Sequence, residues 1–113
     1  MLTEKDYCDH NICIALEKLG FPIRRIKVKG EEKRVPILLY EAQKWLREEK
    51  KIDVLIELVT KDIHLSSKYY SIHISYMSRF RREFKYMSKN FDSYEEALSK
   101  GVKYAVKILK ESL

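Results

Sequence analysis

The stretch that decides the fold is Ser93-Tyr94-Glu95-Glu96-Ala97-Leu98, with the apolar residues that follow it to Leu109. Ser93 and Glu96 have the spacing of a capping box, in which each side chain accepts a hydrogen bond from the other residue's backbone N–H. Apolar side chains then recur at intervals of three and four residues, which predicts a helix over 94–112. They are Tyr94, Ala97, Leu98, Gly101, Val102, Ala105, Val106 and Leu109.

A glycine lies inside this apolar stripe. Because glycine costs a helix about 1 kcal/mol relative to alanine, Gly101 indicates close approach to a sheet rather than helix stability. The opposite face of the helix carries Lys100, Lys103, Lys107 and Lys110. The helix is therefore predicted to cover a preceding sheet with its apolar side.

Three segments before this helix alternate with the period of two that is typical of β-strands, at 52–60, 69–77 and 80–88. The connections between them, the first at 62–67, are short enough for hairpins. This predicts an antiparallel three-stranded sheet over about 52–89 with one face under helices. In the last strand the pattern places Phe80, Phe84 and Tyr86 inward and Arg81, Glu83 and Lys85 outward.

Two further helices are predicted. The first covers 7–20 and ends at Gly20, and the second covers 39–50, where Trp45 is the expected anchor between helix and sheet. The whole chain, 1–113, is then one α+β domain. After residue 39, the predicted elements are a helix, three strands and a helix. This order resembles that of the double-stranded-RNA-binding domain. That family begins its last helix with lysines that face phosphate, whereas this chain has Glu95 and Glu96 there, which argues against duplex RNA.

Composition and charge limit the class of protein. The 113 residues include 23 Lys and Arg against 17 Asp and Glu, a formal net charge of +6. That excess favours an acidic partner, although charges of mixed sign also describe an ordinary solvated surface. No apolar run is long enough for a membrane span, and the polar residues 1–6 are unlike a signal peptide. Two cysteines without a secretion signal indicate a reducing cytoplasm.

Candidate catalytic and metal-binding groups are few. Three residues that could supply soft metal ligands lie within a span of six: Cys8, His10 and Cys13. A structural zinc site needs a fourth ligand from a second knuckle, which the sequence does not offer. Ser71, His73 and Ser75 alternate on one strand, so they point the same way without meeting as nucleophile and base. The sequence predicts no metal, no cofactor, no small-molecule ligand and no enzymatic activity.

Two basic clusters are the strongest functional signal. One, between residues 22 and 36, has six basic side chains and two acidic ones, and the other, between 79 and 89, has five and one. The primary predicted contacts are Arg79, Arg81, Arg82 and Lys85, and the secondary ones are Arg24, Arg25 and Lys27. Arginines near aromatic residues suit phosphate and base contact. The alternative is a pair of solvated hairpin arms whose charges discourage edge pairing. The first cluster lies in 23–39, which alternates as a hairpin with a turn at Gly30-Glu31-Glu32.

Three motifs of the chain are Leu16-Glu17-Lys18-Leu19-Gly20-Phe21, Ala42-Gln43-Lys44-Trp45-Leu46-Arg47-Glu48 followed by a strand that opens at Ile52, and Ser93-Tyr94-Glu95-Glu96-Ala97-Leu98 with Gly101. Together they resemble a family of small uncharacterised proteins of Bacteroidota phages and prophages. The resemblance leaves 22–38 unmatched and carries over no catalytic residue. It implies a phage protein that binds host machinery. The hypothesis is an anti-CRISPR protein that binds and inhibits a host RNA-guided nuclease or its guide-RNA complex. The alternative is a basic domain that binds RNA or DNA directly.

Overall fold

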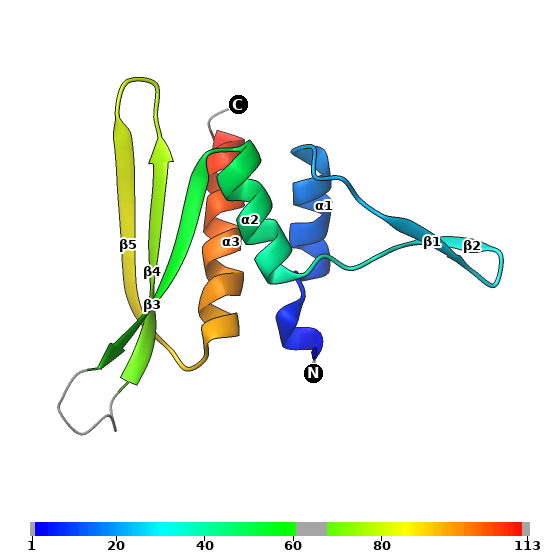
Figure 1. Cartoon of the computed structure of the whole chain (residues 1–113), viewed down its shortest axis with the longest axis horizontal. Helices are drawn as coiled ribbons and strands as arrows, with labels where there is room; N and C mark the ends of the chain where they lie inside the picture. Colours follow the sequence, from blue (N-terminus) through cyan, green and yellow to red (C-terminus); the bar gives the residue numbers. More distant parts are fainter. Residues whose placement is uncertain (1, 61–67, 112–113) are drawn as a thin grey trace.

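Three consecutive antiparallel strands form a sheet at one end of the molecule (Figure 1). They are β3 (Ile52–Thr60), β4 (Lys68–Met77) and β5 (Arg82–Phe91), with β4 in the middle. The structure is a computed structural model that describes residues 2–60 and 68–111, so the predicted connection at 62–67 lies outside the described residues. The α+β class and the antiparallel three-stranded sheet are confirmed.

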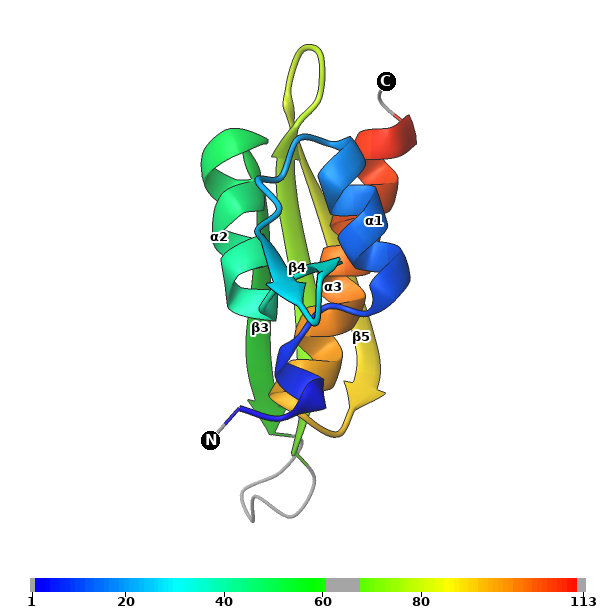
Figure 2. The same cartoon turned by 90° about the vertical axis from the view of Figure 1, so that its right-hand side faces the viewer.

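Helices cover one face of this sheet and leave the other open. Figure 2 shows α1 (His10–Lys18), α2 (Leu39–Glu49) and α3 (Tyr94–Glu111) in front of the sheet, all on the same side. The predicted order of helix, three strands and helix is therefore present from α2 to α3. No helix in the described part of the chain is both long enough and apolar enough to cross a membrane.

The core lies between the sheet, α2 and α3, and extends between α3 and α1. Ala42 and Leu46 are the fully buried residues of α2, and Gln43 Nε2 donates a hydrogen bond of 2.7 Å to the Val54 carbonyl. Trp45, the predicted anchor, is half-buried and meets the ring of Phe21 edge-on at 5.3 Å between centroids. Ala42, Leu46 and the Gln43 hydrogen bond therefore hold α2 on β3, while the tryptophan packs toward the segment that follows α1.

The first helix is shorter than the predicted 7–20. It starts at His10 because Asp9 caps it, with Asp9 Oδ1 accepting a hydrogen bond of 2.9 Å from the Ile12 N–H. Tyr7 is outside the helix and pairs with Leu38 in an isolated β-bridge, after a short 3-10 turn, Glu4–Asp6. Gly20 follows the helix with a φ of 106°, the left-handed conformation typical of a helix end.

A two-stranded ribbon, β1 (Arg25–Val28) and β2 (Glu31–Arg34), projects from the end of the molecule opposite the sheet (Figure 1). A hairpin within the predicted 23–39 is confirmed, but it is shorter than predicted, and its turn is Lys29-Gly30, with φ of 52° and 81°, rather than Gly30-Glu31-Glu32. Ile37, assigned by its alternation to the second arm, is buried at 2% exposure, because the chain leaves the ribbon and returns to the core.

The side-chain alternation of β5 is the reverse of the predicted one. Phe84 and Tyr86 point to the open face with exposed fractions of 74% and 55%, and Phe80, in the turn before the strand, is 89% exposed. Lys85, predicted to point away from the helices, is paired with the buried Ile74 on the helix side of the sheet.

The reversal follows from the position of β5 at the edge of the sheet. Helix-side positions on an edge strand reach past the covering helices, so a lysine there keeps its ammonium group in water. The residues with which β5 does contribute to the core are Met87 and Phe91. They pair with Ile72 and Tyr70, so four positions of β5 span two of β4, which is a bulge in the pairing. Because Met87 and Phe91 are four residues apart, alternation keeps both on the helix side.

Candidate nucleic-acid interface

The open face of the sheet presents aromatic and apolar side chains to solvent. Leu55, His73 and Tyr86 form one cross-strand row, and Ser75 and Phe84 pair in the next. Opposite side chains in antiparallel strands lie about 5 Å apart. Together they line a shallow hollow of about 700 Å³. A monomer seldom exposes several large apolar side chains side by side, so this face is a candidate contact surface.

The aromatic groups of this face differ in how firmly they are held. The rings of Tyr86 and His73 meet at 4.7 Å between centroids with an interplanar angle of 48°. His73 Nε2 lies 2.7 Å from Glu57 Oε2, without the alignment of a hydrogen bond, so the contact is electrostatic when the imidazole is protonated. Phe84 has no ring partner among the described residues. Its face is available for stacking.

Arg82 is held beside this aromatic surface. Its Nη1 donates a hydrogen bond of 2.7 Å to Ser75 Oγ. Since Ser75 pairs with Phe84 across the strands, the hydroxyl holds the guanidinium along the open face next to an exposed ring. A fixed guanidinium can form paired hydrogen bonds to phosphate and can stack on a base.

The other two predicted arginines lie in the β4–β5 turn, which is closed by hydrogen bonds from Ser78 N and Ser78 Oγ to the Arg81 carbonyl. Arg81 Nε donates to Glu83 Oε1 at 2.8 Å, and this bond raises the pKa of Arg81. Its guanidinium is therefore already paired, although the side chain is exposed. Arg79 is exposed and has no ion pair among the described residues.

Lys85 joins the open face to the helix side. It lines a hollow of about 270 Å³ together with Tyr104 and Lys107 of α3, and Tyr86 lines both this hollow and the one on the open face. The arginine and the aromatic residues on the open face of β5 are therefore continuous, around the edge of the strand, with the lysines on its helix side. We call Arg82, Phe84, Lys85 and Tyr86 the β5 edge surface.

The second predicted cluster lies elsewhere. Arg24 forms an ion pair of 3.4 Å with Glu41, and Arg25 forms one of 2.8 Å with Glu17, at the base of the ribbon. Lys27, on the ribbon itself, is exposed. The ribbon and the sheet occupy opposite ends of a molecule 56 Å long (Figure 1), so the structure does not bring the two clusters together.

Sequence reasoning missed Phe84 and Tyr86 as surface residues because the alternation of β5 assigned them to the core. The sequence offers one sign of the true orientation: the apolar Met87 lies on the same side of the strand as Glu83 and Lys85. A strand with charges on one side and aromatics on the other has two possible orientations, and only its edge position decides between them.

Of the two cysteines, Cys8 is buried and Cys13 is half-buried. Burial raises the pKa of Cys8 to about 12, so its thiol is protonated at neutral pH. Cys13 Sγ donates a weak hydrogen bond of 3.7 Å to the Cys8 carbonyl. Within residues 2–60 and 68–111, no three His, Cys, Asp or Glu side chains form a group that could hold a metal ion.

Compared with protein-family models, curated proteins and solved structures, the chain finds no match. The side chains alone therefore indicate which ligands this surface can bind. On β4, the ring of His73 contacts Tyr86 and Glu57 rather than a serine hydroxyl. The groups that the β5 edge surface offers are aromatic rings and permanent cations, which bind anions and planar groups.

Proposed function

We propose that this chain is a non-catalytic nucleic-acid-binding protein, and that its β5 edge surface holds a single strand. One observation carries the proposal: an exposed Phe84 lies beside Arg82, whose guanidinium is oriented by Ser75. Bases would stack on Phe84 and Tyr86, and phosphates would pair with Arg82 and Lys85. Stacking of a base on an aromatic side chain contributes about 1–3 kcal/mol and tolerates any sequence.

A single strand suits this surface better than a duplex. The aromatic faces can be reached only by bases that are not already stacked in a helix, and single-stranded RNA is the form that offers such bases. Glu95 and Glu96 lie in the first turn of α3, where their charges repel a phosphate backbone. The net charge of +6 supplies the long-range attraction for the strand.

The resemblance to phage proteins favours one particular role for this binding. In that role the strand is the guide RNA of a host RNA-guided nuclease, and the protein blocks the nuclease in the bacterial cytoplasm. Such an inhibitor needs no turnover, and its arginines can pair with phosphates or with acidic side chains of the nuclease. This anti-CRISPR role remains our second proposal, because it rests on the motifs of the sequence.

The proposed binding is tested by fluorescence anisotropy with labelled 12-nucleotide RNA, the matching DNA and an RNA duplex, from low to physiological salt. We expect the single strands to bind more tightly than the duplex, with an affinity that falls linearly with salt on logarithmic axes. Replacing both Phe84 and Tyr86 by alanine should weaken binding at least tenfold. Tyr40→Ala, which removes an exposed aromatic residue from α2, is the matched control. Absence of binding at low salt would contradict the proposal.

The inhibitor role needs a separate assay, cleavage of a target by purified host nuclease and guide RNA. Inhibition that requires the nuclease complex, and that is weakened when Arg79, Arg81 and Arg82 are changed to glutamate, would support it. Because these side chains are exposed, the variant should keep its melting temperature. Full cleavage with saturating protein, across the nucleases of the host, would exclude the role and leave direct binding in place.

A further inference from the structure

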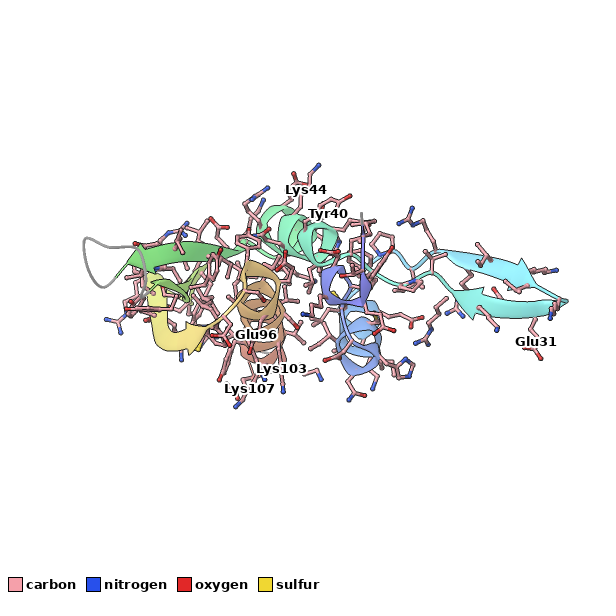
Figure 3. All side chains as sticks on the ribbon, turned by 90° about the horizontal axis from the view of Figure 1, so that it is seen from below. Glu31, Tyr40, Lys44, Glu96, Lys103 and Lys107 are labelled. Carbon is pink, nitrogen blue, oxygen red and sulfur yellow. The ribbon has the colours of Figure 1, made fainter. Side chains whose placement is uncertain are left out.

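A row of lysines on α3 faces a groove that the β5 edge surface does not include. The groove runs between α1 and α3, has a volume of about 460 Å³, and has a partly apolar floor that includes Ile12, Ala15 and Val106. Its cationic residues are Lys100, Lys103, Lys107 and Lys110. No carboxylate from residues 2–60 or 68–111 lines it. Figure 3 shows Lys103 and Lys107 projecting on the same side of the molecule, away from Lys44 on α2.

No ion pair or hydrogen bond within the described residues accounts for these lysines. All four are exposed, and none has an ion pair or hydrogen bond within the described residues. Like charges three and four residues apart on a helix repel each other. The negative end of the helix dipole compensates Lys107 and Lys110, which lie near the C-terminus, and Glu96, one turn before Lys100, offsets part of the charge of that lysine. Lys103 has neither compensation. A bound polyanion would remove this repulsion.

The groove is continuous with the β5 edge surface. Tyr86 lines the open-face hollow and the hollow between β5 and α3, and Tyr104 and Lys107 line that second hollow and the α1–α3 groove. Three open hollows in series fit a linear polyanion better than a compact ligand. Among the described residues, Glu111 is the one carboxylate that lines the middle hollow or the groove. A further hollow at the start of α3, which Lys100 also lines, has Glu4, Asp9, Glu95 and Glu96.

We infer that a strand bound at the β5 edge surface continues over α3, and that the lysine row holds its phosphates. This inference rests on the proposed function. From Lys100 to Lys110 the helix rises about 15 Å, at 1.5 Å per residue. That length matches about four phosphates at the 3.4 Å spacing of one strand of a duplex, and fewer in an extended strand. Together with bases on Phe84 and Tyr86, the full site takes about six nucleotides.

The test compares a 4-nucleotide and a 12-nucleotide oligouridine on the full chain and on the double variant Lys103→Gln with Lys107→Gln. We expect the variant to bind the long strand at least tenfold more weakly and the short strand within twofold of the unmodified chain. Its logarithmic salt slope should fall by about 1.4, which is 0.7 for each lost phosphate contact. Lys44→Gln, on the opposite side of the molecule, should change neither affinity.

The outcomes separate the two proposals. Equal losses for both lengths, or no loss for the long strand, would overturn the path over α3 and leave the β5 edge surface as the binding site. If neither oligonucleotide binds the unmodified chain, the proposed function and this extension of it both fail. Glutamine keeps the helix propensity of lysine, so circular dichroism and the melting temperature should show an unchanged fold in every variant.

Discussion

A Cβ atom placed on Gly101 would come within 2.5 Å of Cγ1 of Val54. The main chain of α3 therefore rests directly on β3. The methyl group it meets belongs to a fully buried residue and cannot move aside into solvent. This contact sets the distance between helix and sheet, and with it the positions of the lysines on the outer side of α3.

Gly101→Ala should destabilise the fold, although alanine is the better helix former. Overpacking typically costs about 1–3 kcal/mol, and the gain in helix propensity returns about 1 kcal/mol. A net loss of up to about 2 kcal/mol in the free energy of unfolding is expected from urea denaturation. Adding Val54→Ala should cost less in this background than in the unmodified chain, because it removes the clashing methyl. A stability increased by about 1 kcal/mol, the full gain in helix propensity, would contradict the close approach.

The part of the fold built by α3 could be predicted because each signal was local. The hydroxyl half of the capping box is present, with Glu96 N donating to Ser93 Oγ at 3.1 Å. The glycine in the apolar stripe indicated the contact with the sheet. The orientation of β5 could not be predicted, because it depends on how far α3 reaches across the sheet, and that is set by packing between distant segments.

The reversed orientation of β5 predicts opposite results at two phenylalanines of the same strand. Phe91→Ala should lower the free energy of unfolding by about 3–5 kcal/mol, because Phe91 is buried at 6% exposure. Phe84→Ala, at 74% exposure, should change it by no more than about 0.5 kcal/mol. Chemical denaturation measures both. A large loss at Phe84 would restore the orientation expected from the sequence.

Glu17 holds the base of the ribbon through two arginines, with Oε1 at 2.8 Å from Arg25 Nη2 and Oε2 at 2.8 Å from Arg34 Nη2. Glu17→Gln should leave global stability within about 1 kcal/mol, because exposed ion pairs contribute little. It should increase amide exchange in β1 and β2, which no core residue anchors. Glu41→Gln, which breaks the single longer pair with Arg24, is the control and should have a smaller effect.

Cys8 predicts a stability that depends on pH in the alkaline range. Burial raises the pKa of its thiol from 9.0 to about 12, so the folded state favours the neutral form. This contribution is fully present below about pH 9 and is lost as the pH rises toward 12. Because tyrosines and lysines also titrate there, the measurement is the difference between the unmodified chain and Cys8→Ala. At neutral pH, alkylation should modify Cys13 before Cys8, and equal rates would contradict the burial.

For the candidate site, sequence reasoning selected Arg79, Arg81 and Arg82 as equals, since all three are arginines near one turn. The three arginines differ in the hydrogen-bond partner of the guanidinium, and that partner depends on how the side chains are arranged in the fold. Glu83 pairs with Arg81, two residues away, and Ser75 binds Arg82 from the neighbouring strand. Only the pairing of β4 with β5 reveals that the second contact orients its arginine beside Phe84.

This difference predicts an order of effects on binding. Arg82→Gln should weaken the affinity for single-stranded RNA at least fivefold, because Arg82 is held beside the stacking surface. Arg81→Gln should weaken the affinity less than twofold. The Arg81 guanidinium must leave Glu83 before it can pair with a phosphate, and exchanging one exposed ion pair for another gives little net free energy. Ser75→Ala, which keeps Arg82 but removes its hydrogen bond, should give an intermediate loss. Anisotropy titrations at one fixed salt concentration measure all three. If Arg81→Gln proved the most damaging, the turn rather than the β5 edge surface would be the main contact.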